Sequence, residues 1–382
     1  MNKQQIQLLF QQVFNNEADL CVQSPGRINI IGEHTDYNNG FVLPAAIDKK
    51  VIVGIRKRDD DLIVMYAEAF EEKKEVKIPE MKPLGDWADY ILGVVAQLIK
   101  KDYIVGGFEI LLTGDIPIGA GLSSSAAVEC ATIFALNELF RFGLEKMEMV
   151  QLAQMAEHEY AGVKCGIMDQ FASMFGKKDH LIKLDCRSLE YEYIPFQNQD
   201  YALVLFNSNV KHALVDSEYN IRRNQCNEGV EMIRKYHPQI NSLRDVETEM
   251  VEKYIRPQDE LIYRRCQYVV SENIRLLQLC RALNHNNLDK CGKLMHETHL
   301  GLSEDYEVSC PELDLLVKIA MEQTGVIGAR LVGGGFGGCT INLVRKENLE
   351  SVIYEVENGY KLSSGKESTT YIVSVEDGTK LI

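Results

Sequence analysis

SPGRINIIGEHTDYNNGFVLP, residues 24–44, is the stretch that decides the fold of this 382-residue chain. An apolar run at 28–31 leads into it and a second run at 40–44 leads out of it. Between and beside these runs stand four charged or titratable side chains: Arg27, Glu33, His34 and Asp36. This concentration of polar chemistry makes the stretch a candidate binding segment, and the question is what it holds.

A second informative stretch, GDIPIGAGLSSSAA at 114–127, leads directly into a segment with a helical pattern at 128–140. A glycine-rich loop that opens a helix suits phosphate, because free backbone N–H groups, aligned peptide dipoles and three hydroxyls all face an anion. It is not a Walker loop, because no Lys follows Gly119 or Gly121. The alternative is a turn whose serines only cap the helix.

A third stretch, LVGGGFGGC at 331–339, has glycines at the spacing of the dinucleotide fingerprint. That fingerprint opens a helix, whereas the residues at 340–344 have a strand pattern, so the context rejects it. Five glycines in six residues indicate positive φ angles or a close approach by another group. A tight hairpin is an equally good interpretation of this stretch alone.

Two carboxylates complete the set of candidate groups. Glu157 lies late in a helical run, and Asp169 is flanked by apolar residues, where a lone carboxylate needs a partner. For either one, the plainer interpretation is a solvated glutamate or a helix-capping aspartate.

Composition limits the class of protein. Lys and Arg total 41 against 56 Asp and Glu, a formal charge of -15, which disfavours binding to nucleic acid or to an anionic membrane. The ten cysteines include no Cys-x-x-Cys pair, which favours a reducing cytosol and a cytoplasmic protein. Residues 1–14 have the apolar spacing of an amphipathic helix and not the pattern of a signal peptide.

The order of patterns along the chain predicts an α+β fold. Strand patterns at 51–55 and 62–66 precede helical patterns at 86–100 and 125–140, and the middle of the chain, 219–283, is rich in helix formers. Strand patterns return at 327–344 and 369–375, and a domain boundary is expected between 190 and 205.

Taken together, these motifs carry a resemblance to a known family. Residues 26–37 resemble the signature of galactokinases, within the GHMP small-molecule kinase superfamily, and residues 121–127 and 328–339 resemble that superfamily's ATP motif and C-terminal glycine motif. Segments 165–171 and 305–314 are also similar to galactokinase segments, so the likeness covers nearly the whole chain. It implies a two-domain GHMP kinase, with a ribosomal S5 domain 2-like domain at 1–200 and a ferredoxin-like domain at 201–382.

The resemblance implies ATP-dependent phosphorylation of the anomeric (C1) hydroxyl of α-D-galactose, the first committed step of galactose catabolism. Asp169 is expected beside the attacking hydroxyl, with Arg27 keeping it ionised and stabilising the transferred phosphoryl group. Ser125 and Glu157 are expected to bind Mg²⁺, with ATP as co-substrate. The implied sugar contacts are Glu33, His34, Thr35, Asp36, Gly166 and Tyr219. The implied ATP contacts are Gly119, Ala120, Gly121, Leu122, Ser123, Ser124 and Ser125.

Other interpretations stay open. Glu, His and Asp side chains offer mostly acceptors, a mixture that suits a polyol. A metal site is the rival interpretation of three such side chains so close together, and the resemblance assigns them to sugar hydroxyls. A kinase for N-acetylgalactosamine or another sugar is one rival, and a catalytically silent sensor of galactose and ATP is another, although a sensor is expected to lack a catalytic group. We expect a monomer whose partners are small molecules, without nucleic acid or membrane.

Three further positions complete the analysis. The histidines of His296-Glu-Thr-His299 are three residues apart, whereas a zincin helix needs four, so we interpret this segment as helix surface. Many relatives have Asp in place of Asn39, and often Ser in place of Ala67. The second difference weakens one expected nucleotide contact.

Overall fold

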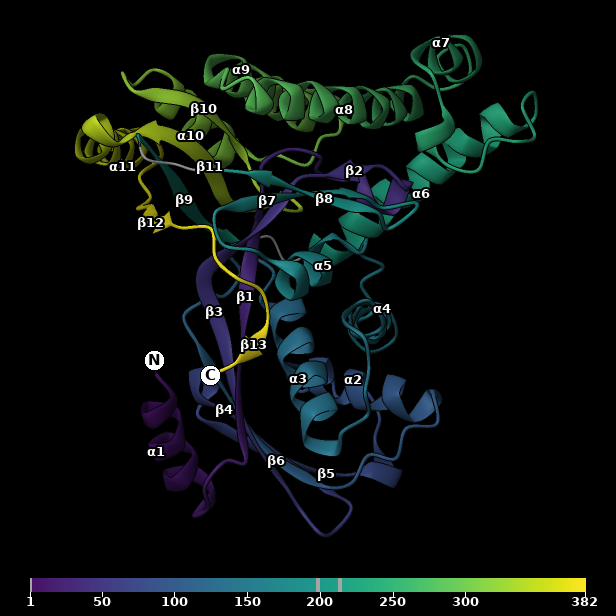
Figure 1. The fold of residues 1–382 in the computed structure, drawn as a ribbon. Helices are drawn as coiled ribbons and strands as arrows, with labels where there is room; N and C mark the ends of the chain where they lie inside the picture. The colour runs from purple at the N-terminus through teal and green to yellow at the C-terminus, as the bar shows by residue number, and fades with distance from the viewer. Residues whose placement is uncertain (1, 197–199, 212–214) are drawn as a thin grey trace.

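The computed structural model describes residues 2–196, 200–211 and 215–382, which form two layered parts joined one above the other (Figure 1). The strands are β1 (Leu20–Asn29), β2 (Phe41–Val42), β3 (Pro44–Lys57), β4 (Leu62–Ala67), β5 (Glu72–Lys77), β6 (Phe108–Gly114), β7 (His180–Asp185), β8 (Tyr191–Pro195), β9 (Tyr201–Lys211), β10 (Val326–Leu331), β11 (Gly337–Arg345), β12 (Thr369–Val373) and β13 (Lys380–Leu381). The helices are α1 (Lys3–Phe14), α2 (Asp89–Lys100), α3 (Ser124–Phe140), α4 (Lys146–Ala156), α5 (Met168–Phe175), α6 (Val215–Arg234), α7 (Thr248–Met250), α8 (Glu260–Asn284), α9 (Leu288–Leu300), α10 (Pro311–Met321) and α11 (Leu349–Ser364).

The lower part is built on a six-stranded sheet in the order β13-β1-β3-β6-β4-β5, in which only the β4–β6 pair is parallel. Successive side chains of β3 point to opposite faces, so Val53 faces the core on the side of α3 while Ile52 faces the cluster that contains the buried residues of α1. A capping box between Asn2 and Gln5 starts α1, whose buried Ile6 and Phe10 face the sheet.

Helix α3 lies at the centre of the lower part, between the sheet and α2, α4 and α5 (Figure 1). Eleven of its seventeen residues are buried, on every side of the helix, as expected for a helix enclosed by other elements. The glycine-rich loop before α3 is therefore mounted on a rigid support.

The upper part contains a four-stranded antiparallel sheet, β10-β11-β9-β12, covered by α9, α10 and α11. A small third sheet, β2-β7-β8, lies between the two parts (Figure 1). After β12 the chain runs back down to the lower part, where β13 pairs with β1. The predicted division at residue 200 coincides with the start of β9, but the last residues return to the first sheet, so the division stays a prediction.

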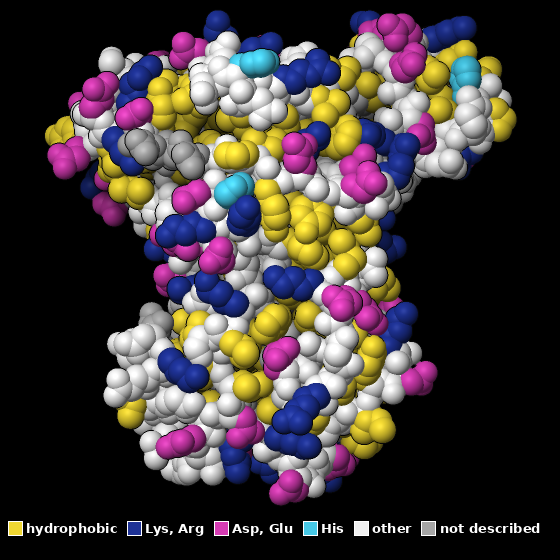
Figure 2. All heavy atoms as spheres, in the orientation of Figure 1, with side chains coloured by type: hydrophobic (Ala, Val, Ile, Leu, Met, Phe, Trp, Pro, Cys, Tyr) yellow, Lys and Arg dark blue, Asp and Glu magenta, His cyan; other side chains and the backbone are white. Residues whose placement is uncertain are grey.

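The predicted α+β architecture and its order of elements are confirmed. The strand patterns at 51–55 and 62–66 lie in β3 and β4, and the helical patterns at 86–100 and 125–140 correspond to α2 and α3. Within the described ranges, no helix combines the length and apolarity needed to cross a bilayer. Acidic and basic side chains are interspersed on the face shown in Figure 2.

Candidate active site

Segments far apart in the sequence meet at a single cleft of about 400 Å³. Its wall contains Arg27 from β1, and Glu33, His34 and Asp36 from the segment after β1. Residues 119–125, from the loop before α3 and the start of that helix, also line it. The wall is completed by further groups from three other parts of the chain: Glu157, Cys165, Asp169, Tyr219 and residues 332–338. The loop at 119–125 and the Asp169 carboxylate thus share one cavity.

Asp169, in the first turn of α5, is held by a two-pronged contact with Arg27. Nε of Arg27 donates to Oδ1 at 2.7 Å and Nη2 donates to Oδ2 at 2.9 Å, while Ser123 Oγ donates to Oδ2 at 2.5 Å. Burial opposes the Arg27 charge, yet Asp169 and Glu33 raise the pKa of its guanidinium above the usual value. Asp169 does not cap α5, whose N-cap residue is Ile167, so the capping interpretation is wrong.

The glycine-rich loop before α3 uses its hydroxyls on carboxylates and not as helix caps. Gly119 and Gly121 have φ angles of 75° and 76°, and Ser123, the N-cap residue, has a φ of 58° and makes no side-chain capping bond. Ser123 turns to Asp169, and Ser125 Oγ donates to Glu157 Oε1 at 3.0 Å. The capping alternative therefore fails for both hydroxyls.

The second glycine-rich stretch is both a hairpin and a close contact. It joins the antiparallel strands β10 and β11 and lies against the first loop. A β-carbon on Gly333 would stand 2.9 Å from the Gly121 carbonyl oxygen, and one on Gly338 would stand 3.2 Å from that of Ala120. Glycine is required here because the two loop backbones touch.

Glu157 belongs to a chain of buried polar groups, so a solvated glutamate is the wrong interpretation. It lies in the π-helical turn Glu157–Ala161 that follows α4, and its side chain is buried. Gln170 Nε2 donates to Glu157 Oε2 at 2.6 Å and to Glu129 Oε2 at 3.0 Å. Burial and the nearby Asp169 charge raise the pKa of Glu157 to about 7.

A hydrogen-bonded relay fixes the state of His34. Burial lowers the pKa of its imidazole to about 4, so the ring is neutral at pH 7. Its Nε2 lies 3.2 Å from the Gly334 carbonyl oxygen, which can only accept, so Nε2 carries the proton and Nδ1 accepts from Tyr37 at 2.7 Å. Tyr37 in turn accepts from the Tyr306 hydroxyl at 2.7 Å. His34 must therefore exchange a protein partner in order to bind a ligand hydroxyl.

Asp36 and Gly166 lie back to back beside the cleft. The Tyr37 backbone N–H donates to Asp36 Oδ1 at 2.9 Å. Burial and the Asp169 charge raise the pKa of Asp36 to about 7. The backbone of Gly166 is packed against the Asp36 carboxylate and lines a neighbouring cavity of about 300 Å³.

Tyr219 and Thr35 occupy different surroundings. The Tyr219 ring, on α6, lines the cleft 5.3 Å from the His34 ring and 5.1 Å from the Tyr37 ring, between ring centroids. Thr35 is fully buried behind the cleft wall, where its hydroxyl donates to the carbonyl oxygens of Gly32 and Phe41. Its hydroxyl is thus engaged by the backbone, and a direct sugar contact by Thr35 stays a prediction.

A second cavity, of about 640 Å³, adjoins the cleft at Ser124 and Ser125. Three aromatic side chains, Phe70, Trp87 and Tyr90, line it. The Phe70 and Trp87 rings are stacked with centroids 6.4 Å apart. Sequence reasoning missed this cavity, although Trp87 is the only tryptophan in the chain and could have drawn attention to it.

The helix-surface interpretation of residues 296–299 is wrong for its second half. Thr298 and His299 are buried, and His299 Nε2 lies 3.3 Å from Asp314 Oδ1. The helix packs between α8 and β10, which covers this face. Among the described residues, no group of three or more His, Cys, Asp or Glu side chains could hold a metal ion alone.

Family comparisons agree with this architecture. Models described as the N-terminal and C-terminal domains of GHMP kinases match residues 89–177 and 279–362. Fold and cleft together thus define a GHMP kinase. A model described as the galactokinase galactose-binding signature matches residues 8–57.

Individual relatives narrow the assignment. A galactokinase of Thermotoga petrophila is 42% identical over 361 residues, 94% of this chain and 99% of the relative, and one of Clostridium acetobutylicum is 41% identical over 379 residues, 98% and 97% respectively. The crystal structure of Lactococcus lactis galactokinase complexed with galactose superposes with a TM-score of 0.95 at 36% identity and covers 99% of both chains. The chain belongs to the galactokinase family and is a phosphotransferase. The Methanococcus jannaschii mevalonate kinase, at 20% identity, 94% and 98% coverage and a TM-score of 0.66, shares the fold.

Proposed function

We propose that this member of the galactokinase family transfers the γ-phosphoryl group of ATP to the C1 hydroxyl of α-D-galactose, with Asp169 and Arg27 at the reacting hydroxyl. The observation that carries the proposal is the shared cleft, in which the Asp169–Arg27 pair lies between the sugar segment and the loop at 119–125. A cavity of about 400 Å³ is large enough for a hexose and part of a triphosphate.

The sugar side of the cleft offers mainly acceptors. Glu33 and Asp36 accept hydroxyl protons, and Tyr219 supplies a ring and a hydroxyl beside His34. Gly166 acts by leaving room for Asp36, and Thr35 acts by holding the turn that presents these groups. Acceptors placed beside one tyrosine hydroxyl suit a polyol, whose hydroxyls both donate and accept.

The nucleotide side begins at the loop of residues 119–125. Its backbone N–H groups and the start of α3 favour the negative charge of phosphates. The adjoining cavity, reached at Ser124 and Ser125, is lined by Trp87 and Phe70 and accepts the flat base. Ser125 and Glu157 provide two hard oxygen ligands 3.0 Å apart, so they fit Mg²⁺, which takes its remaining ligands from water and phosphate. When bound, Mg²⁺ neutralises charge on the phosphate oxygens.

The Asp169–Arg27 pair supports the chemical step in two ways. Arg27 orients the carboxylate through two hydrogen bonds, so an Asp169 oxygen can accept the C1 hydroxyl proton as the new O–P bond forms and the bond to ADP breaks. Because phosphoryl transfer has a loose transition state, the proton moves late, and the Arg27 charge also favours the negative transferred group.

The test is turnover on a panel of sugars with a coupled assay for ADP release. Turnover with galactose supports the proposal, and turnover only with N-acetylgalactosamine or another sugar overturns the substrate. Binding of galactose and ATP without turnover identifies a sensor. Asp169→Asn should lower kcat by about 10²- to 10⁴-fold while galactose binding, measured by calorimetry, persists.

Four further assignments belong to the proposal: Mg²⁺ as the metal, a monomer, a cytoplasmic location and a division near residue 200. All ten cysteines are free thiols, which supports a reducing compartment. The division is supported by β9, which starts at Tyr201 and belongs to the four-stranded sheet of the upper part. Metal titration of the apoenzyme tests the assignment of Mg²⁺, and mass measurement in solution tests the monomer.

A further inference from the structure

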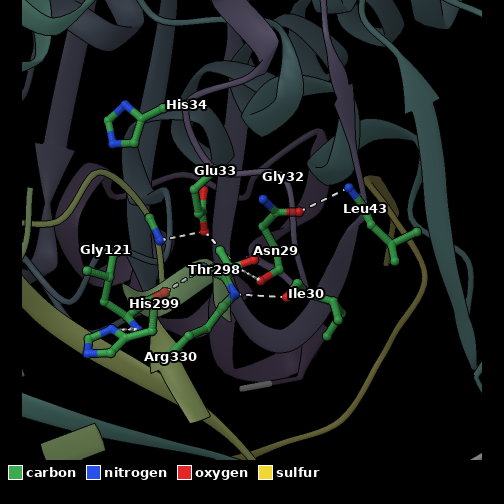
Figure 3. A network of polar contacts seen from close by, with 12 residues as sticks. Asn29, Ile30, Gly32, Glu33, His34, Leu43, Gly121, Thr298, His299 and Arg330 are labelled. Carbon is green, nitrogen blue, oxygen red and sulfur yellow. Dashed lines mark hydrogen bonds and ion pairs between the residues drawn. The ribbon is translucent and has the colours of Figure 1, made fainter. Parts of the chain in front are cut away.

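Glu33 and Arg330 are 297 residues apart in sequence and form a buried ion pair beneath the cleft (Figure 3). Arg330, on β10, is fully buried, and its Nη2 donates to Glu33 Oε1 at 3.0 Å. The Gly333 backbone N–H donates to the same oxygen at 2.8 Å. Both contacts therefore converge on one of the two carboxylate oxygens.

The other donors of Arg330 leave Glu33 as its one charged partner among the described residues. Nε donates to the Ile30 carbonyl oxygen at 2.8 Å, and the remaining bonds go to the carbonyl oxygens of Asn29 and Leu331. Figure 3 shows Arg330 below Glu33 and beside Asn29 and Ile30. Because a buried charge is costly without an opposite one, Arg330 and Glu33 depend on each other.

Glu33 Oε2 is in a different position. It has no hydrogen-bond partner in the part of the chain that the structure describes, and the side chain lines the cleft. A carboxylate with one oxygen fixed by two donors has little freedom to rotate. The second oxygen is thereby offered in one orientation.

We propose that Arg330 is a positioning residue for galactose binding: with the Gly333 N–H, it holds Oε1 of Glu33 so that Oε2 faces a sugar hydroxyl. This inference rests on the proposed function, because it assigns the ligand of Glu33. It adds a specificity element from the second half of the chain to a sugar site built mainly from the first half.

The experiment compares steady-state kinetics of Arg330→Lys, Glu33→Gln and the double variant. Lys keeps the charge but lacks the fork that reaches both the carboxylate and the carbonyls. Arg330→Lys should raise the KM for galactose about tenfold, with the KM for ATP and kcat each within about threefold. In the Glu33→Gln background, the same substitution should change the KM for galactose less than about twofold, because the two residues act as one unit.

Arg265→Lys is the matched control. Arg265 is also buried and also bonds a carbonyl oxygen and a carboxylate, that of Glu307, which does not line the cleft. It should lower stability against urea and leave the KM for galactose unchanged. A selective effect at Arg330 then reports sugar positioning and not the loss of a buried arginine.

Glu33→Asp keeps the proposal testable should Arg330→Lys fail to fold. The aspartate retains the charge that Arg330 needs but is one methylene shorter. It cannot contact Arg330 with one carboxylate oxygen and also place the other at the sugar hydroxyl, so its KM for galactose should rise at least tenfold. An unchanged KM in Glu33→Asp, or in folded Arg330→Lys, overturns the positioning role while galactose turnover by the wild type upholds the proposed function. No galactose turnover by the wild type overturns the function itself.

Discussion

Gly166 lies directly against the Asp36 carboxylate: a β-carbon built on Gly166 would stand 2.0 Å from Asp36 Oδ2. Glycine is required at this position by close approach, since its φ angle is not in the positive range. Asp36 is thus held in place by a missing side chain as well as by the Tyr37 N–H.

Gly166→Ala should therefore displace Asp36 and weaken galactose binding. A hydrogen bond to a charged group contributes about 1.5–3 kcal/mol, so the KM for galactose should rise roughly 10- to 150-fold. Gly106→Ala is the control, because its β-carbon would meet only the Phe140 ring, at 3.4 Å. Equal KM values for the two variants would show that Asp36 does not need this space.

The titration of Asp36 gives a pH dependence. Its pKa is raised to about 7, chiefly by burial and then by Asp169, and the ionised form is the better acceptor. The KM for galactose should fall about tenfold between pH 6 and pH 8, because the ionised fraction rises by that factor. Asp36→Asn should raise the KM at pH 8 and flatten the profile, and a profile that persists in this variant assigns the titration elsewhere.

The raised pKa of Asp36 also predicts that folding stability decreases with rising pH, whereas galactose binding improves. Below about pH 4 both states carry the Asp36 proton, and between about pH 4 and pH 7 the unfolded state loses it while the folded state keeps it. Stability therefore declines as pH rises through this window. Asp36→Asn should unfold at a higher temperature than the wild type at pH 8, and a differential scan at pH 4 and pH 8 measures the difference.

Local patterns predicted much of this molecule. The glycine and serine loop at 119–125 and the strands β3 and β4 were predictable because their signals lie within a few neighbouring residues. The resemblance to galactokinases placed Asp169 and Arg27 together although they are 142 residues apart. No local pattern carries that information.

Pairings between distant segments could not be predicted in the same way. The contact of Arg330 with Glu33 depends on how β10 packs against the segment after β1. The residues of neither segment indicate this packing. His299 was interpreted as helix surface because its spacing from His296 does not fit a zincin helix, yet its own face of α9 is covered by β10. Burial of one helix face by a later strand is a tertiary property.

Glu129 offers a test of buried charge beside the proposed Mg²⁺ ligands. It is fully buried, its Oε1 has no partner among the described residues, and burial together with Glu157 raises the pKa of its carboxyl well above the usual value. Because burial favours the neutral form of this carboxyl, Glu129→Gln, a neutral side chain of the same shape, should preserve kcat within about threefold. Glu129→Ala should lose about 2–4 kcal/mol of stability, because it leaves a cavity and an unpaired Gln170 N–H. Steady-state kinetics measures kcat and urea unfolding measures the stability of both variants, and a severe loss of kcat or stability in Glu129→Gln would mean that the charged carboxyl is needed.

Trp87 tests the proposed base cavity separately from the proposed sugar site. Its indole N–H donates to Glu72 at 2.6 Å and its ring stacks on Phe70, so one face of the cavity is a fixed aromatic wall. Stacking of a base on an aromatic ring contributes about 1–3 kcal/mol, so Trp87→Ala should raise the KM for ATP roughly 5- to 150-fold while the KM for galactose stays within about twofold.

Tyr236→Ala is the matched control, since that ring is 59% exposed and stacks on Tyr254, outside both cavities. A Trp87→Ala variant that keeps its ATP affinity but remains folded would place the base elsewhere. Loss of galactose affinity alone would instead mean that the two cavities do not divide the substrates at Ser124 and Ser125.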